Sequence, residues 1–189
     1  FNDQPVKEQD YCGLQHQLFT YAVMKILNEF MAQKYISLHN VSIACTRPSV
    51  VFGYGRKRSS LMWAEEFATN PALGKKVHLP FPEENKDNYI YVEDCAEQFI
   101  ELSLKETLNH FVYNTGSETV SGIELKKIIK DLVPDAEVTF DEKGKPTPFI
   151  DDQNDKRIRE ELSFVPKSLK EGIKSQMNEA RIANNLKPL

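Results

Sequence analysis

Residues 41–53 read Val-Ser-Ile-Ala-Cys-Thr-Arg-Pro-Ser-Val-Val-Phe-Gly, and they give the clearest indication of the fold class. Its first part, residues 41–46, is short, apolar and partly β-branched, which is typical of a strand buried in a parallel sheet. Arg47-Pro48 is expected to end that strand, because proline cannot donate to a β-ladder. Residues 50–55 should follow as a loop. Ligands of open α/β sheets bind at such strand ends, so we expect chemistry here.

The segment before this strand reads as one long helix, from about residue 15 to residue 35, without Gly or Pro. Apolar side chains cover most of its circumference and spare one polar stripe. A helix that is apolar on several sides is buried on several sides. We therefore expect one side to pack on a sheet and another on a partner subunit, which predicts a homodimer. The polar stripe runs through Gln17, Tyr21, Lys25, Asn28 and Glu29.

Tyr21 and Lys25 are the chemically most informative pair on this stripe. Their spacing puts a phenol and an ammonium on one helical face, one turn apart. A nearby cation favours the phenolate, so the pair is a candidate proton donor and acceptor near neutral pH. The same spacing is also common in amphipathic surface pairs without any catalytic role.

Downstream, predicted strands alternate with predicted helices, which indicates an α/β architecture. Residues 61–69 read as a helix that Asn70-Pro71 stops. Three further helices are expected to open at capping boxes that begin at Asp94, Ser121 and Ser168. The remaining elements are expected as strands at 77–80, 89–92, 111–114 and 136–140, and as a helix at 155–162. Only one strand before residue 75 looks deeply buried, so the first half of the sheet is expected to be missing.

Composition excludes several classes of protein. A net charge of −4 and a pI near 5.7 argue against a nucleic-acid binder. No apolar run approaches the roughly 18 residues of a membrane helix. Cys12, Cys45 and Cys95 are odd in number and widely spaced, which favours a reducing cytoplasm, and the four histidines have no metal-like spacing. The N-terminus is neither a signal peptide nor a Met, so we expect a chain cut from a longer one.

Five sequence blocks occur in a fixed order. They are Tyr21-x-x-x-Lys25-x-x-x-Glu29, Arg47-Pro-Ser-Val-Val-Phe-Gly53, Tyr89-Ile-Tyr-Val-Glu-Asp-Cys-Ala96, Tyr113-Asn-Thr-Gly116 and the stretch 159–172. Together they resemble the extended short-chain dehydrogenases/reductases, the NAD-dependent epimerase/dehydratase family. Each block is weak alone, but five in order make the resemblance specific.

The resemblance implies roles for the matched residues. Tyr21 would be the general acid/base that exchanges a proton with a substrate hydroxyl or carbonyl while hydride moves to or from NAD or NADP. Lys25 would hydrogen-bond the nicotinamide ribose together with Tyr21. Pro48, Ser49 and Val50 would lie beside the nicotinamide. The cofactor carries the hydride chemistry, so the protein's task is to place it against the substrate.

The sequence also departs from the family pattern. It contains no G-x-x-G-x-x-G loop for the cofactor pyrophosphate, and Thr20 is adjacent to Tyr21 and cannot fill the position of the family's upstream Ser/Thr. We therefore expect the C-terminal part of a Rossmann-like doubly wound parallel sheet plus a small substrate-binding lobe, inactive alone. Residues 1–75 would form the C-terminal half of the NAD(P)-binding domain. Residues 76–189 would form mainly the lobe, with 94–115 returning to the Rossmann-like domain.

The substrate is less well defined by the sequence. A sugar, a nucleotide-sugar or a related hydroxy or keto compound is expected, with epimerase, dehydratase and reductase chemistry all open. Four cations could meet a phosphate or carboxylate, although solvated surface charge is the simpler reading; they are Lys57, Arg58, Lys156 and Arg157. His78 and Tyr89 could line the site or pack in strands. The alternatives to an enzyme are a non-catalytic Rossmann-like nucleotide-binding or regulatory protein, and a structural module with idle motifs.

Overall fold

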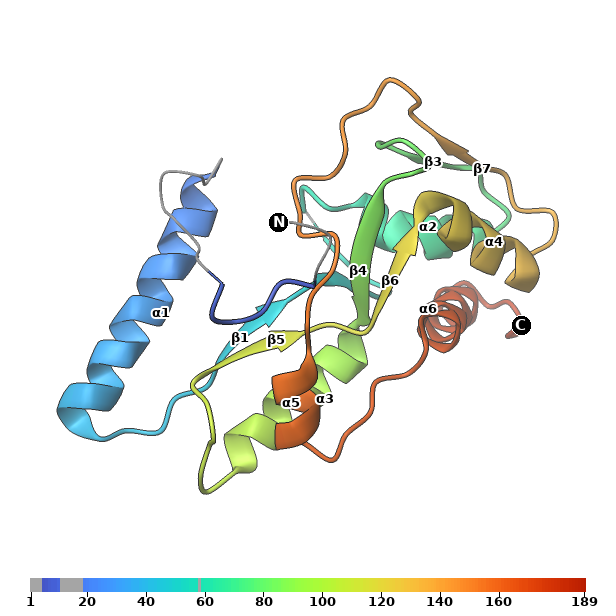
Figure 1. The fold of residues 1–189 in the computed structure, drawn as a ribbon. Helices are drawn as coiled ribbons and strands as arrows, with labels where there is room; N and C mark the ends of the chain where they lie inside the picture. The colour runs from blue at the N-terminus through green and yellow to red at the C-terminus, as the bar shows by residue number, and fades with distance from the viewer. Residues whose placement is uncertain (1–4, 11–18, 58) are drawn as a thin grey trace.

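The structure is a computed structural model that describes residues 5–10, 19–57 and 59–189. In these ranges helices and strands alternate, and the α/β class predicted from the sequence is confirmed (Figure 1). Among the helices of the described residues we find no candidate for a membrane span. The elements are α1 (Thr20–His39), β1 (Cys45–Pro48), β2 (Val50–Phe52), α2 (Trp63–Ala72), β3 (Val77–Leu79), β4 (Lys86–Tyr91), α3 (Val92–Leu104), β5 (Val112–Thr115), β6 (Glu118–Ser121), α4 (Gly122–Leu132), β7 (Val138–Phe140), α5 (Lys156–Glu161) and α6 (Leu169–Ala183).

Parallel pairing dominates the sheets. β1 pairs with β5 in parallel, from Cys45 opposite Val112 to Pro48 opposite Thr115. β4 is the central strand of a second sheet, with β2 parallel on one side and β6 antiparallel on the other. β3 and β7 form a further parallel pair. The strand β6 was not expected from the sequence, which offered only one short β-branched pair, Thr119 and Val120, after the predicted strand at 111–114.

The larger hydrophobic core surrounds β2 and β4, and α2 and α6 contribute to it. The ring of Phe52 lies 5.6 Å from that of Phe67 and 6.4 Å from that of Tyr89. Trp63 makes an edge contact with Phe81 at 4.9 Å between ring centroids. Such tilted and edge-on aromatic pairs add stability beyond the area that they bury.

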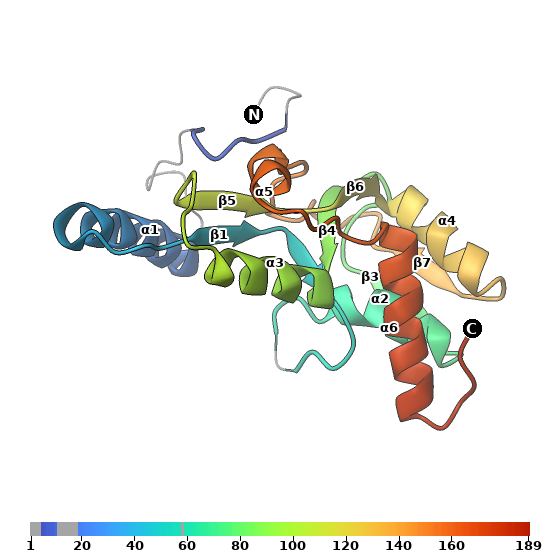
Figure 2. The same cartoon turned by 90° about the horizontal axis from the view of Figure 1, so that it is seen from below.

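A smaller core joins β5 to α3 and α5. It contains Leu102, Tyr113, Ile158 and Leu162. The hydroxyl of Tyr113 donates to Glu161 at 3.0 Å, and burial raises the pKa of Tyr113 to about 12, so the phenol stays neutral and can donate. Figure 2 shows α3 running along one face of the β1–β5 pair.

The long helix α1 differs from its prediction. It has no buried residue, whereas burial on several sides was expected, and Leu38 is 73% exposed. Figure 1 shows α1 standing to one side of the sheets. The apolar residues do form a helix, but within the described chain only one side of it is half-buried, through Ala22, Ile26, Ala32 and Ile36. The helix ends at His39, beyond the predicted residue 35, where Asn40 adopts a left-handed conformation with φ 52°. The predicted start near residue 15 lies outside the described residues.

Residues 41–53 also differ from their prediction in detail. Arg47 and Pro48 are the last two residues of β1, so the strand ends with them as expected, but it begins only at Cys45 instead of residue 41. Val50–Phe52 is a strand, not a loop. Pro48 is tolerated because the next ladder bond runs from the amide of Ser49 to the carbonyl of Thr115, at 3.0 Å. β1 is only partly buried, so the expectation of a deeply buried strand is wrong for this chain.

Two helix ends differ from their predictions as well. α2 continues through Pro71 to Ala72, and the turn ends at Gly74, whose φ of 70° suits glycine. α3 begins at Val92, so Asp94 is not its N-cap. The Asp94 carboxylate instead accepts bonds from the amide and the ammonium of Lys167, at 2.8 and 3.0 Å. The capping boxes at Ser121 and Ser168 are confirmed.

Candidate active site

Tyr21 and Lys25 lie in the first two turns of α1, as their spacing predicts. The ammonium of Lys25 lies over the ring of Tyr21, with 5.2 Å between Nζ and the ring centroid. This is a cation–π arrangement. Tyr21 is 69% exposed, and no hydrogen bond or ion pair within the described ranges joins either side chain to a third residue. Both polar groups can therefore engage a ligand.

Pro48, Ser49 and Val50 lie at the carboxyl end of β1, the edge of a parallel sheet where ligands bind. The amide of Ser49 is already bonded to Thr115. The Ser49 hydroxyl is buried and has no hydrogen-bond partner among the described residues. Leaving a buried hydroxyl unbonded is unfavourable, so Ser49 Oγ is a polar group at this edge that a ligand could satisfy, as is Thr115 Oγ1 at the end of β5.

These residues fit the nicotinamide end of a dinucleotide better than its pyrophosphate end. Pyrophosphate binds at a helix N-terminus that carries no competing negative charge. The first turns of α2, α3, α4 and α6 already carry carboxylates, among them Glu65, Asp94, Glu124 and Glu171. Because the sequence also lacks a glycine-rich loop, groups that could hold a pyrophosphate are not found in the described chain.

The helix pair and the strand-end residues are not in direct contact. Within the residues that the structure describes, no hydrogen bond, ion pair or ring contact joins Tyr21 or Lys25 to Pro48, Ser49 or Val50. The two groups are connected through Arg47, whose guanidinium bonds Glu29 on α1. The sequence blocks contained both residues but assigned a role to neither, because a bond between two distant segments leaves no local signal.

The cations and strand residues that sequence reasoning considered lie apart from this edge or are engaged elsewhere. Lys156 pairs with Glu160 at 3.5 Å, an exposed ion pair within α5. His78 is exposed on β3 and bonds Thr139 at 3.0 Å. Tyr89 is 2% exposed and has the packing role. Lys57 is exposed, whereas Arg58 lies outside the described residues.

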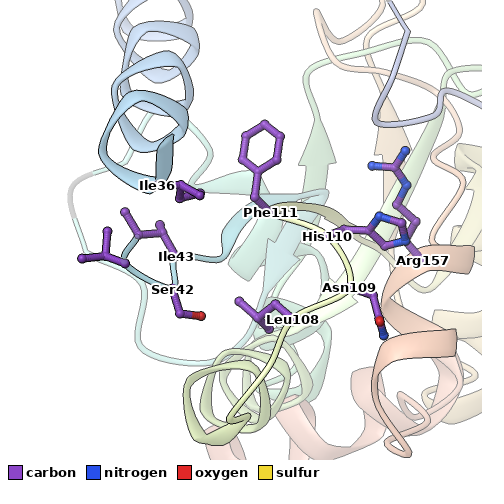
Figure 3. A pocket seen from close by; sticks show the side chains of 9 residues that line it. Ile36, Ser42, Ile43, Leu108, Asn109, His110, Phe111 and Arg157 are labelled. Atoms are coloured by element: carbon purple, nitrogen blue, oxygen red, sulfur yellow. The ribbon is translucent and has the colours of Figure 1, made fainter. Parts of the chain in front are cut away.

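A pocket of about 540 Å³ opens beside α1 but contains none of the predicted site residues (Figure 3). Two of its lining residues come just before these strands in the chain: Ile43 lies shortly before β1, and Phe111 directly precedes β5. The pocket therefore lies toward the amino ends of these strands, opposite the edge that carries Ser49. Its walls are largely apolar, with His110 and Arg157 at one side.

Comparison with known proteins gives the family. The family model described as "NAD dependent epimerase/dehydratase family" matches residues 2–116. A comparison with curated protein sequences gave no match.

Solved structures of similar fold are numerous. UDP-glucose 4-epimerase from Thermotoga maritima, solved with UDP-glucose, shares 21% identity and has a TM-score of 0.75, covering 95% of this chain and 58% of its own. L-threonine 3-dehydrogenase from Trypanosoma brucei shares 17% identity, with a TM-score of 0.77 and coverages of 97% and 59%. UDP-glucose 4-epimerase from Thermus thermophilus, in complex with NAD, shares 21% identity, with a TM-score of 0.70 and coverages of 94% and 60%.

These likenesses show the fold, and the chain spans less than two thirds of the length of each of these structures. The family model, in contrast, matches the sequence itself over more than half of the 189 residues, and the match includes both the Tyr21–Lys25 pair and the end of β1. The chain belongs to the NAD dependent epimerase/dehydratase family.

Proposed function

We propose that this chain supplies the proton-transfer site of an NAD- or NADP-dependent epimerase, dehydratase or dehydrogenase. The observation that carries the proposal is the exposed Tyr21 phenol with the Lys25 ammonium over its ring, in a chain of this family. A phenol beside a cation can exchange a proton with a substrate hydroxyl or carbonyl. When bound, the nicotinamide would supply hydride chemistry.

Each predicted site residue has a role in this proposal. Tyr21 is the general acid/base, and Lys25 orients the nicotinamide ribose. Ser49 lies beside the nicotinamide between Pro48 and Val50, and its unpartnered buried hydroxyl supports that placement. The intact Tyr21–Lys25 pair counts against a purely regulatory protein, because the two exposed groups support no packing in this structure.

The proposed substrate carries a secondary hydroxyl or the matching ketone, on a sugar, a nucleotide-sugar or a related small molecule. The structural neighbours include enzymes named for UDP-glucose and for L-threonine, and both compounds contain a secondary alcohol. Residues 1–75 would belong to the cofactor-binding domain and 76–189 mainly to the substrate lobe. The parallel pairing of β1 with β5 supports the return of residues 94–115 to the first domain.

We further propose that the protein acts as a homodimer through α1. The helix exposes a row of large apolar side chains that would otherwise face water, which is typical of an interaction surface. They are Met24, Leu27, Phe30, Met31, Tyr35 and Leu38.

The test uses Tyr21→Phe in the natural polypeptide that contains this chain, assayed with NAD and NADP against a panel of sugars, nucleotide-sugars and hydroxy acids. We expect turnover to be abolished while cofactor affinity changes little, since only the phenolic hydroxyl that exchanges the proton is lost. Tyr35→Phe is the matched control, because Tyr35 is a similarly exposed tyrosine of the same helix. Full turnover in Tyr21→Phe would refute the assignment. The 189-residue chain alone is expected to bind cofactor weakly and to show no turnover.

A further inference from the structure

Four charged residues form a chain of polar contacts that runs from α1 to α5. They are Glu29 on α1, Arg47 on β1, Glu8 in the segment 5–10, and Arg157 on α5. The proposed catalytic roles use none of them. Their arrangement nevertheless connects the helix of Tyr21 and Lys25 to the sheet edge that carries Ser49.

The first link is the pair between Arg47 and Glu29. Arg47 Nε donates to Glu29 Oε1 and its Nη2 to Oε2, both at 2.7 Å. This two-point geometry fixes orientation as well as distance, and lysine cannot reproduce it. The side chains are 30% and 22% exposed, so the pair is more shielded than an ordinary surface ion pair. α1 buries no residue fully and has only one half-buried side, so packing alone holds the helix weakly, and this two-point ion pair adds to it.

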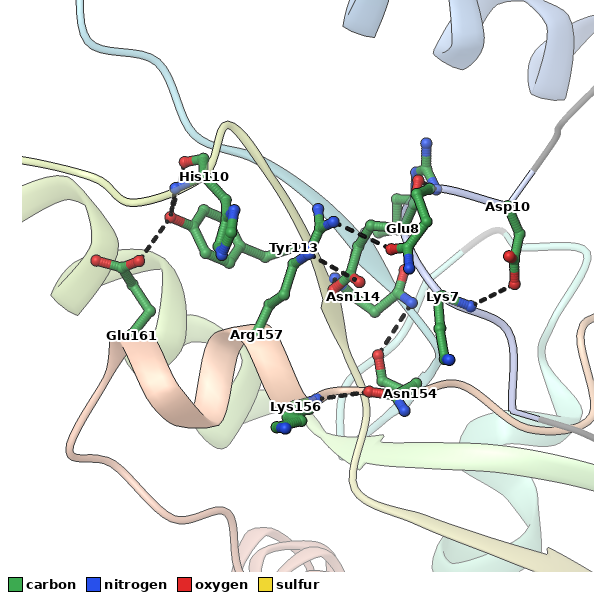
Figure 4. A network of polar contacts seen from close by, with 12 residues as sticks. Lys7, Glu8, Asp10, His110, Tyr113, Asn114, Asn154, Lys156, Arg157 and Glu161 are labelled. Carbon is green, nitrogen blue, oxygen red and sulfur yellow. Dashed lines mark hydrogen bonds and ion pairs between the residues drawn. The ribbon is translucent and has the colours of Figure 1, made fainter.

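The second link holds the other side of Arg47. Its Nη1 donates to the backbone carbonyl of Glu8 at 3.2 Å. The Glu8 carboxylate, whose side chain is 3% exposed, accepts a bond from the amide of Asn114 at 3.0 Å and pairs with Arg157 at 3.4 Å (Figure 4). The amide of Val6 also donates to the carbonyl of Asp152 at 3.0 Å. The segment 5–10 is therefore fastened to β5, to α5 and to the loop before α5.

Because Glu29 lies on the same helix as Tyr21 and Lys25, fixing Glu29 also orients these two residues. Glu29 follows Lys25 by one helical turn and Tyr21 by two, and a helix transmits orientation over that distance. Arg47, on β1, in turn precedes Ser49 by two residues in the chain. The Arg47–Glu29 pair therefore relates the two halves of the candidate site, which have no direct contact in the described chain.

We propose that Arg47 is a positioning residue that acts through Glu29, and is itself held by Glu8, to place Tyr21 and Lys25 at the carboxyl end of β1. This inference rests on the proposed function. Misplacing reacting groups by about 1 Å can cost roughly 100-fold in rate, so a catalytic effect is expected although Arg47 touches no reacting atom.

The catalytic test is a double-mutant cycle of Glu29→Gln and Arg47→Gln in the natural polypeptide. We expect kcat to fall about 10- to 100-fold in each single variant, with KM and the cofactor Kd changed less than about threefold. The double variant should lose no more than the worse single variant, because both act through one contact. Lys170→Gln is the control, since it removes an exposed ion pair with Asp131 far from this site. Additive losses, or a change confined to KM, would overturn the proposal.

A second measurement needs neither cofactor nor activity. Most of the stability of a helix in a protein comes from its tertiary contacts, so an α1 that has lost one should exchange its amide hydrogens faster. In the 189-residue chain, exchange across residues 20–39 should rise at least about tenfold in Arg47→Gln and Glu29→Gln, and stay unchanged in Lys170→Gln and across β4. Unchanged exchange in α1 would overturn the positioning role. Faster exchange together with a wild-type polypeptide that lacks all turnover would refute the proposed function while leaving the anchor established.

Discussion

The hydroxyl of Thr147 donates to Oδ1 of Asp87 at 2.6 Å, and Asp87 has no exposed surface. The other carboxylate oxygen accepts a bond from Asn85 Nδ2 at 2.8 Å. Both donors are neutral. Burial therefore dominates and raises the pKa of Asp87 to about 6, against the lowering effect of the two hydrogen bonds and with a further rise from Asp151. The contact fastens the loop that precedes α5 to the beginning of β4.

This relationship predicts an unusual pH dependence of stability. The folded pKa lies above the unfolded one, so the folded state favours neutral Asp87. Its stabilising contribution is complete below about pH 4 and is lost as the pH rises through about 6. We expect Asp87→Asn to raise the free energy of unfolding at pH 8 by roughly 1–3 kcal/mol. The variant's free energy of unfolding should also change less with pH than that of the wild type between about pH 4 and 6. Asparagine can bond both neighbours, since the Thr147 hydroxyl lies 3.3 Å from Asn85 Oδ1 and can redirect its hydrogen there.

Urea unfolding of the two proteins at several pH values measures this effect. Asp135→Asn is the control, because Asp135 is an exposed carboxylate of the same chemistry. Equal stability of wild type and Asp87→Asn at pH 8, with parallel pH profiles, would show that the charge on Asp87 does not destabilise the folded state.

The two capping boxes give a prediction about local helix stability. Ser121 Oγ accepts the amide of Glu124 at 3.2 Å, and Ser168 Oγ accepts that of Glu171 at 3.3 Å. Ser121→Ala and Ser168→Ala should each lower the free energy of unfolding by about 1 kcal/mol, because each leaves one helix amide, that of Glu124 or Glu171, unbonded. Ser103→Ala removes a serine that bonds only the carbonyl of Ile100 near the end of α3 and should be nearly neutral. Thermal or denaturant unfolding that ranks Ser103→Ala with the two caps would contradict this account.

The boxes also show what a sequence can predict here. Ser121 and Ser168 were predictable because a capping box closes within four residues. Asp94 satisfied the same pattern, but a tertiary contact with Lys167 engages its carboxylate instead. Val50–Phe52 was misread as a loop because its partner, β4, is remote in sequence.

The candidate site divides in the same way. The proximity of Tyr21 and Lys25 follows from helical spacing alone, and in the structure the Lys25 ammonium does lie over the Tyr21 ring. The Arg47–Glu29 contact depends on how α1 meets β1, which neither segment encodes locally. The exposure of α1 could not be predicted either, because an apolar pattern indicates that a helix face can be buried but does not identify the element that buries it.

Close packing of α6 on the sheet yields a further prediction. A Cβ at Gly172 would lie 2.9 Å from Phe52 Cζ and 3.0 Å from Tyr91 Cβ. Gly172→Ala should therefore destabilise the fold by about 1–3 kcal/mol through overpacking, although alanine is the better helix former. Lys174→Ala changes an exposed residue of the same helix and should leave stability within about 0.5 kcal/mol. Denaturant unfolding decides, and a Gly172→Ala variant as stable as wild type would mean that α6 can move away without cost.

The last prediction uses two matched pairs on one helix. Lys25 lies over the ring of Tyr21, and Lys34 lies over the ring of Phe30, both with 5.2 Å between Nζ and the ring centroid. The pairs share spacing and geometry, but only the first has a phenolic hydroxyl. If the hydroxyl is the reason for Lys25, Lys25→Met in the natural polypeptide should lower kcat/KM at least about 100-fold, as loss of acid/base assistance typically does. Lys34→Met should leave kcat/KM within about twofold, because it removes the same exposed cation–π contact and no proton-transfer group. Steady-state kinetics with both variants compare the two pairs directly. Equal losses of kcat/KM in both variants would mean that the two lysines stabilise the helix, and that Lys25 does not assist proton transfer by the Tyr21 phenol.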